Sequence, residues 1–211
     1  MTFVNHLAEL RVLRNRYVAV RHGESEANVA HVISSNPKIG CENHGLTEYG
    51  RTQVLNNSRI FLGQNSSTEE MIIISSDFRR ARETAEILAA VIGEQVGKNL
   101  SIKLDQRLRE RFFGIFDGKN DQFYEEIWKT DEKNPTENLS NQVESVESVQ
   151  QRTTSVIREI EDQHENGTIF LVSHGDSLQI LQTAFERMSN PNKQRDLPHL
   201  DRAEFRPLIL K

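Results

Sequence analysis

The N-terminal part of the chain contains the segment YVAVRHGESEAN at residues 17–28. Its first four residues are strand formers, and Arg21, His22 and Gly23 follow them at once. A polar stretch compatible with a helix begins at Ser25, a residue type that is favoured at helix N-caps. The segment therefore predicts a strand, a tight turn and the start of a helix, with a guanidinium group and an imidazole at the turn.

Two later segments repeat this pattern. Residues 71–74 form a continuous apolar run and lead into a helical pattern that carries Arg80. Residues 168–172 form another apolar run, followed by His174 and Gly175 and then by apolar residues at helical spacing. Short apolar strands that alternate with helices are typical of a mostly parallel sheet that is buried on both faces. We therefore expect an α/β fold, a three-layer α/β/α sandwich.

Ligands of such sheets bind outside the carboxyl ends of the strands. That edge is predicted to carry Arg21 and His22 from one strand, Arg79 and Arg80 from just beyond another, and His174 from a third. Helix N-termini at the same edge add backbone N–H groups, which favour an anion. One Arg-His-Gly tripeptide carries little information, and a lone histidine at a strand end is more often structural. The second His-Gly makes a shared anion pocket the better interpretation.

The size and hydropathy of the chain indicate an ordinary globular protein. Its 211 residues, 36% of them hydrophobic, are enough for one domain with a substantial core, and we expect a single domain over residues 1–211. No apolar run approaches the roughly 18 residues that a membrane span needs. The polar N-terminus offers no secretory signal, so the expected location is the cytoplasm, away from membranes.

Charge and cysteine content exclude further classes. A formal net charge of −5 argues against a general nucleic-acid binder, which would present a basic face to phosphates. Cys41 is the only cysteine, so neither an internal disulfide nor a thiolate zinc site is possible. The H-E-x-x-H spacing of a histidine zinc site is also absent. We expect no metal and no cofactor.

Several groups of residues resemble, in order, the motifs of the histidine phosphatase superfamily, whose fold is called phosphoglycerate mutase-like. The similar residues are Arg21, His22, Gly23, Glu24, Ser25 and Asn28; Leu46, Thr47, Glu48, Gly50, Arg51 and Gln53; Ser76, Asp77, Arg80, Ala81, Thr84 and Ala85; Leu108, Glu110, Arg111, Phe113 and Gly114; and Val172, Ser173, His174 and Gly175. The resemblance extends over about residues 18–181.

The resemblance implies a role for each site residue. His22 would attack phosphorus, and Glu110 would act as the general acid. The transferring phosphoryl group would be bound by Arg21, Arg80 and His174. The pocket would be completed by Asn28, Ser25 and the backbone amide of Gly175.

Two of these assignments have alternatives in the sequence. Ser25 is also a candidate cap for the helix that follows it. Glu110 lies among three arginines, where a glutamate is usually a member of a surface ion pair. Asp105 and Glu24 are the competing carboxylates for the role of general acid.

The chemistry of a phosphate monoester suits these residue types. Its negative charge repels nucleophiles, so guanidinium groups that pair with phosphate oxygens are needed first. Neutral imidazole is a nucleophile near neutral pH and needs no metal to form. A carboxylic acid can protonate the leaving alkoxide. We therefore predict a metal-independent phosphatase that hydrolyses a small phosphorylated metabolite through a phosphohistidine.

The sequence departs from the family's mutases at one informative position. Phe112 follows Arg111 where those mutases carry a histidine, and this chain is shorter. Both differences favour hydrolysis. A cofactor-dependent phosphoglycerate mutase-type phosphotransferase is the alternative, and a non-catalytic phosphate-binding scaffold is a weaker one.

Outside the motifs, the polar and mostly acidic residues 119–143 are predicted to form a lid-like insertion. In it, Tyr124 and Trp128 are expected either to contact the substrate or to hold the insertion against the core. Leucines at near-helical spacing predict a helix within residues 1–14 that packs against the core or, as the alternative, contacts a partner. Residues 144–162 are expected to form a helix, and residues 206–210 a last strand. The sequence predicts neither the particular substrate nor the oligomeric state.

Overall fold

The computed structural model describes residues 3–65 and 70–211. Within these residues a five-stranded sheet has the order β3-β2-β4-β1-β5. Its strands are β1 (Arg16–Arg21), β2 (Met71–Ser75), β3 (Ile102–Leu104), β4 (Thr168–Ser173) and β5 (Phe205–Leu208). The first four strands pair in parallel, whereas β5 runs antiparallel to β1. The predicted α/β fold with a mostly parallel sheet is confirmed.

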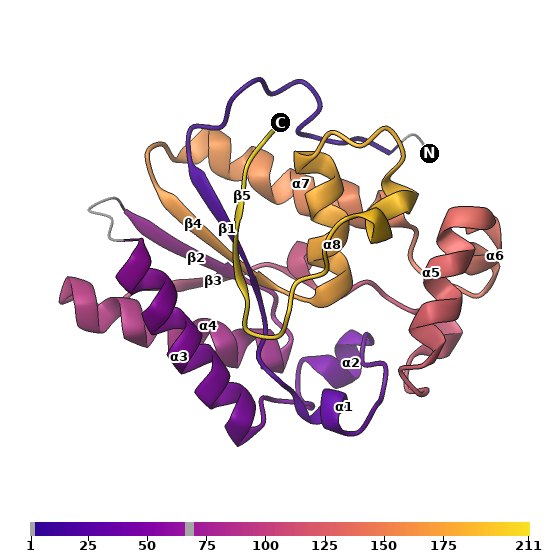
Figure 1. Cartoon of the computed structure of the whole chain (residues 1–211), viewed down its shortest axis with the longest axis horizontal. Helices are drawn as coiled ribbons and strands as arrows, with labels where there is room; N and C mark the ends of the chain where they lie inside the picture. Colours follow the sequence, from indigo (N-terminus) through magenta and orange to yellow (C-terminus); the bar gives the residue numbers. More distant parts are fainter. Residues whose placement is uncertain (1–2, 66–69) are drawn as a thin grey trace.

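Long helices cover both faces of the sheet (Figure 1). On one face lie α3 (Glu48–Gln64) and α4 (Arg79–Val96), and on the other lie α7 (Val146–Gln163) and α8 (Gly175–Phe185). These layers form the predicted α/β/α sandwich. The expected helix over residues 144–162 is α7, which begins two residues later because the Ser145 hydroxyl accepts a hydrogen bond from the Ser148 amide.

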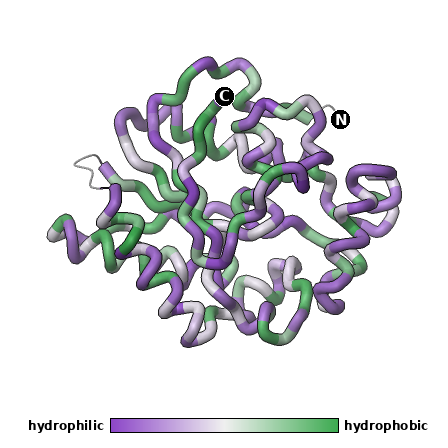
Figure 2. The backbone as a smooth tube through the Cα atoms, viewed as in Figure 1, coloured by the Kyte–Doolittle hydropathy of each residue, from purple (hydrophilic) through white to green (hydrophobic). Residues whose placement is uncertain are grey.

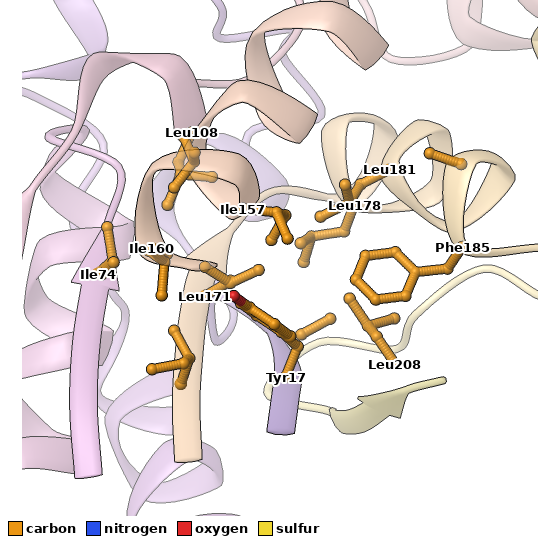
Figure 3. Close-up of a cluster of buried hydrophobic side chains, with 14 of the residues drawn as sticks. Tyr17, Ile74, Leu108, Ile157, Ile160, Leu171, Leu178, Leu181, Phe185 and Leu208 are labelled. Atoms are coloured by element: carbon orange, nitrogen blue, oxygen red, sulfur yellow. The ribbon is translucent and has the colours of Figure 1, made fainter. Parts of the chain in front are cut away.

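The core follows from the alternation of side chains along β1. Val18 and Val20 pack in the cluster beneath α3 and α4, whereas Tyr17 and Ala19 pack in the cluster with α7 and α8. Figure 3 shows this second cluster, in which the ring of Phe185 from α8 approaches Tyr17. In Figure 2 the hydrophobic colour is concentrated along the central strands. Burial on both faces explains why these strands are continuous apolar runs in the sequence.

Shorter elements connect these layers. They are the helices α1 (Glu26–Val29), α2 (Pro37–Gly40), α5 (Phe123–Lys133) and α6 (Pro135–Ser140), and 3₁₀ segments at Gln106–Leu108, Gly114–Phe116 and Pro191–Asp196. Residues 119–143 thus contain α5 and α6, which lie at one side of the sandwich (Figure 1). A small apolar cluster that includes Ile33, Phe113 and Ile127 attaches α5 to the rest of the fold.

The helix expected within residues 1–14 is not formed, and that prediction was wrong for the residues described. Residues 3–14 contain turns, bends and irregular chain instead. Leu7 is fully buried in the cluster of α7 and α8. The guanidinium group of Arg187 donates hydrogen bonds to the carbonyl oxygens of Ala8 and Leu10. The leucine spacing therefore reflects packing of an irregular segment against the cluster of α7 and α8. Hydrogen bonds to Arg187 replace those that a helix would form. Residues 1–2 lie outside the described residues.

The expected last strand, residues 206–210, is present as β5, shifted toward the N-terminus. Among the helices of the described residues, none combines the length and the apolar character that crossing a membrane would demand.

Candidate active site

The carboxyl ends of β1, β2 and β4 surround a cavity of about 180 Å³. Seven of the eight residues predicted for the site line it, namely Arg21, His22, Ser25, Asn28, Arg80, Glu110 and Gly175. The eighth, His174, lies behind His22, with the two ring centroids 5.2 Å apart. A second cavity of about 430 Å³ at the opposite edge of the sheet has a mainly apolar lining that includes Phe61 and Phe170. The smaller cavity is therefore the candidate active site.

His22 directly follows β1, and its amide donates a hydrogen bond to the carbonyl of Ser173 in β4. Its Nδ1 atom lies 2.7 Å from the carbonyl oxygen of Gly23. Because a carbonyl oxygen only accepts, Nδ1 carries the proton and Nε2 carries the lone pair. Burial, and then the charge of Arg80, hold the pKa of His22 well below its usual value. The ring is therefore neutral at pH 7 and keeps a nucleophilic nitrogen.

Two of the three arginines that line the cavity each have a buried N–H group without a partner among the described residues. Arg80, in the first turn of α4, donates from Nε to His22 Nε2 at 3.0 Å and from Nη2 to the Ser34 carbonyl, and its buried Nη1 has no partner. Arg21 donates from Nη1 to the Leu200 carbonyl, and its buried Nε has no partner. Unpaired buried donors are costly and rare, so both groups call for an acceptor in the cavity. An anion with several oxygens provides one.

Glu110 is held at the wall of the cavity by the start of α8. Its Oε1 atom accepts hydrogen bonds from the amides of Arg111 and Ser177 and from the hydroxyl of Ser177. The neighbouring arginines form ion pairs with other carboxylates, Arg107 with Asp105 and Arg109 with Asp77. The alternative interpretation of Glu110 as a surface ion-pair member is therefore wrong.

The two competing carboxylates are both engaged elsewhere. Asp105 is bound by Arg107, and Glu24 accepts hydrogen bonds from the Thr47 hydroxyl and from Arg202. Neither residue lines the cavity. Among the three carboxylates considered, Glu110 alone is positioned to exchange a proton with a ligand there.

His174 is fully buried and takes its position from β2 and β4. It follows β4 directly, and its Nε2 atom lies 2.9 Å from the hydroxyl of Ser76, just beyond β2. Its Nδ1 atom is buried and has no hydrogen-bond partner in the part of the chain that the structure describes. Burial, and then the charge of Arg80, hold the pKa of His174 well below its usual value. This neutral ring supports His22 from behind.

Ser25 and Asn28 have two roles at once. The Ser25 hydroxyl accepts from the amide of Asn28, and the Asn28 side chain accepts from the amide of Ser25, which forms a capping box at α1. Both residues also line the cavity. The helix-cap alternative for Ser25 is therefore confirmed beside its position at the site.

Gly175 has a steric reason to be glycine. A Cβ atom at this position would lie 2.9 Å from Nε2 of His199 and 3.2 Å from Cζ of Arg21. The backbone at the start of α8 can thus approach the cavity closely only without a side chain.

The aromatic residues of the insertion hold it against the core, as one of the two expectations stated, and they also line the cavity. Tyr124 and Trp128 line the cavity and are stacked, with ring centroids 5.3 Å apart. Trp128 also donates a hydrogen bond from Nε1 to Asp176, and Tyr124 packs against Phe113. The two side chains therefore form part of the wall and attach α5 to the core.

A buried ion network lies behind this wall. Arg111, fully buried, donates from both terminal nitrogens to Asp131 of α5, at 2.6 and 2.7 Å, and to Asp176 of α8 at 3.2 Å. Its Nε atom donates to the carbonyl of Glu144. Burial raises the pKa of Asp176 to about 6 although Arg111 lies beside it. The network joins α5, α8 and the segment that carries Glu110.

Four further ionisable residues of the lining were not predicted from the sequence. They are Asp121, Asp176, His199 and Arg202. His199 and Arg202 come from the irregular segment between the last 3₁₀ turn and β5, where no periodic pattern or motif exists. Of the four, Asp176 would have been the easiest to predict, because it directly follows the His-Gly pair at the start of a helix. Within residues 3–65 and 70–211 no group of three or more His, Cys, Asp or Glu side chains is arranged to hold a metal ion.

A family model described as "Histidine phosphatase superfamily (branch 1)" matches residues 17–206. The chain is 29% identical over 177 residues to phosphoglycerate mutase-like protein 4 of Arabidopsis thaliana, which covers 81% of this chain and 69% of that protein. It is 28% identical over 167 residues to putative phosphoserine phosphatase 2 of Hydrogenobacter thermophilus, with 77% and 74% covered.

Solved structures agree with these relatives. The mycobacterial glucosyl-3-phosphoglycerate phosphatase in complex with VO3 superposes with a TM-score of 0.66 at 26% identity, over 90% of each chain. Bacillus stearothermophilus YhfR superposes with a TM-score of 0.71 at 26% identity, over 90% of this chain and 89% of that one.

Proposed function

The chain belongs to the histidine phosphatase superfamily, and we propose that it is a metal-independent phosphatase that hydrolyses a phosphate monoester of a small molecule through a phosphohistidine at His22. One observation carries the proposal. The unpartnered N–H groups of Arg21 and Arg80 belong to arginines that line the same cavity as His22. Oxygens of a phosphoryl group would satisfy these two donors and bring phosphorus to the imidazole.

The first chemical step requires an exchange of hydrogen bonds at His22. In the free site, the Nε–H of Arg80 donates to Nε2 of His22 and covers its lone pair. A bound phosphoryl oxygen would take over this donor and free the lone pair for in-line attack on phosphorus. As the N–P bond forms, the bond from phosphorus to the leaving oxygen breaks. Glu110, as a carboxylic acid, gives its proton to that oxygen.

The second step reverses these roles. Glu110, now a carboxylate, removes a proton from water, and the water oxygen attacks phosphorus. The N–P bond breaks, its electron pair returns to Nε2 of His22, and inorganic phosphate is released. The Nδ1–H of His22 donates to Gly23 throughout, so the same ring nitrogen acts in every cycle.

The positive charge at the site suits a reaction without a metal. Arg21 and Arg80 supply two permanent charges that pair with phosphoryl oxygens and stabilise the charge of the transition state. Burial lowers the pKa of both guanidinium groups, which an anionic ligand would oppose. A bound phosphate would therefore neutralise the buried charges of Arg21 and Arg80.

Hydrolysis is favoured over phosphoryl return by the rest of the cavity. A mutase must hold a second anionic group while the intermediate reorients. The remaining arginine of the lining, Arg202, is paired with Glu24, and Phe112 stands where the family's mutases carry a histidine.

The test of this assignment measures where the phosphoryl group goes. With 3-phosphoglycerate and catalytic 2,3-bisphosphoglycerate, we expect free phosphate to exceed 2-phosphoglycerate by at least roughly tenfold, since Arg202, the remaining arginine of the lining, is paired with Glu24 and is not free to hold a second phosphate. The rate should be unchanged in EDTA, because arginines supply the neutralising charge. Isomer formation in excess of phosphate release would favour the mutase, and loss of turnover in EDTA that added metal restores would refute the metal-independent mechanism.

The role of Glu110 predicts a dependence on the leaving group. Glu110→Gln keeps the shape of the side chain but cannot donate the proton, so hydrolysis of alkyl phosphates should fall by roughly 10²- to 10⁴-fold. Nitrophenyl phosphate, whose leaving group needs no proton, should lose far less in the step that forms the phosphoenzyme. Single-turnover rates for both substrates measure the difference. The matched control is Asp105→Asn, which alters a carboxylate outside the cavity and should leave the ratio of the two rates unchanged. Equal slowing of both substrates by Glu110→Gln would contradict its role as proton donor.

A further inference from the structure

His199 is a cavity residue whose protonation is fixed by its neighbours. The side-chain nitrogen of Gln179 donates to the carbonyl of Leu197, so its Oε1 atom faces His199. That oxygen lies 3.0 Å from Nδ1 of His199 and also accepts from Arg195 at 2.7 Å. Nη1 of Arg195 also lies 3.3 Å from Nδ1 of His199, but it makes its shorter hydrogen bond to the amide oxygen of Gln179. An amide oxygen only accepts, so its closer contact with Nδ1 requires that Nδ1 of His199 carries the ring proton. The other ring nitrogen, Nε2, therefore carries a lone pair.

This lone pair lies at the cavity. Nε2 is the atom that a Cβ atom on Gly175 would approach to 2.9 Å, beside the guanidinium carbon of Arg21. The hydrogen bonds of the described residues leave Nε2 without a partner, while Nδ1 is engaged with Gln179. His199 thus offers a hydrogen-bond acceptor next to the arginine that would bind the phosphoryl group.

The surroundings keep His199 an acceptor. Burial, followed by the charges of Arg21, Arg195 and Arg206, lowers its pKa to about 3, so the ring stays neutral at pH 7. A carboxylate placed against Nε2 would meet a lone pair, and it could be bound there only if the ring gained a proton. The same three arginines repel an ammonium group. An uncharged O–H donor has neither disadvantage.

The residues that line the cavity near His199 also favour an uncharged hydrogen-bond donor. Asp121 and Asp176 are acceptors, and the charge of Arg202 is offset by Glu24. Tyr124 and Trp128 supply apolar surface between these groups. Outside the phosphoryl position, this part of the lining therefore consists of hydrogen-bond acceptors, aromatic rings and one arginine whose charge is already paired.

We propose that the leaving group of the substrate is an uncharged, hydroxyl-bearing alcohol, a polyol or a sugar, and that one hydroxyl donates to Nε2 of His199. His199 is then a specificity residue of the site, and it discriminates against a carboxylate at the same position. The inference rests on the proposed phosphatase function and adds the chemical class of its substrate.

Three phosphates that differ in their hydroxyl and carboxylate groups test the inference. Glycerol 3-phosphate and 3-phosphoglycerate differ by a CH2OH group in place of a carboxylate, and propyl phosphate lacks both hydroxyls. The native protein should show the highest kcat/KM for glycerol 3-phosphate, by roughly 3- to 10-fold over each of the others, as one neutral hydrogen bond implies. A preference for 3-phosphoglycerate would overturn the inference.

A variant then assigns the preference to His199. His199→Phe keeps a planar ring and removes Nε2, and it should reduce the advantage of glycerol 3-phosphate over propyl phosphate to less than about twofold. The matched control is His164→Phe, at the opposite edge of the sheet, which should keep the full advantage. If His199→Phe lowers kcat/KM for all three substrates by the same factor, His199 positions Arg21 and the inference is wrong.

A fourth substrate separates this inference from the proposed function. Turnover of p-nitrophenyl phosphate by the native protein, with no advantage for glycerol 3-phosphate over propyl phosphate, would overturn the inference alone. Absence of phosphate release from all four substrates would overturn the proposed function, and the inference with it.

Discussion

Replacing His22 by alanine is expected to abolish the phosphoenzyme and to lower kcat/KM for p-nitrophenyl phosphate by roughly 10⁴-fold or more, as loss of a nucleophile does in other covalent mechanisms. No neighbouring group can replace it. His174 lies behind His22, with its Nε2 atom engaged by Ser76, and Glu110 is held at the opposite side by the amides of Arg111 and Ser177. The arginines would still bind phosphate in the variant, but nothing would attack phosphorus.

The measurement is rapid quenching with a ³²P-labelled substrate, followed by acid or base treatment of the protein. The native protein should give a label that is lost in acid and stable in base, which is the behaviour of a phosphohistidine. His164→Ala, which removes an imidazole far from the cavity, should keep both the label and the activity. A label that survives in His22→Ala, or one that is stable in acid and lost in base, would exclude His22 as the nucleophile.

Replacing Arg111 by methionine is expected to lower the free energy of unfolding by about 3–5 kcal/mol. The change leaves the carboxylates of Asp131 and Asp176 buried without the cation that pairs with both. For a chain of this size such a loss corresponds to a fall in Tm of roughly 6–20 °C. Thermal and urea unfolding of the variant and the native protein measure it.

A matched surface ion pair provides the control. Arg158 pairs with Asp162 one turn away on α7, and both side chains are about half exposed. Arg158→Met should therefore change the free energy of unfolding by roughly 0.5 kcal/mol or less. Adding Asp131→Leu to Arg111→Met should recover part of the loss, since one buried charge is removed. Equal effects of Arg111→Met and Arg158→Met would show that the buried network does not stabilise the fold.

The part of the site around His22 could be predicted from the sequence, because the residues with the relevant chemistry directly follow the strands that form the sheet. His22 and His174 each follow a continuous apolar strand, and parallel strands bring such positions to one edge. The family motifs then supplied Glu110, which no periodic pattern marks. In these places the local pattern and the long-range contacts agree.

The part of the site around His199 could not be predicted from the sequence, and the reason is physical. His199 and Arg202 belong to an irregular segment, whose position depends on tertiary hydrogen bonds such as that from Arg206 to the carbonyl of His199. Such hydrogen bonds depend on which residues are neighbours in the folded molecule, and no periodic pattern or motif in the sequence predicts them. The wrong helix near Leu7 has the same origin, because burial in a core produced a leucine spacing that also fits a helix.

The position of β1 in the sheet has a consequence for how the molecule folds. The strand that leads into His22 pairs only with β4 and β5 among the described strands, and Arg16 of β1 lies opposite Thr168 of β4. About 150 residues must be synthesised before that partner exists. Contacts so distant along the chain slow folding, and an apolar strand without neighbours is exposed to aggregation. During synthesis the proposed nucleophile is thus made early, while its pocket can form only after β4 has left the ribosome.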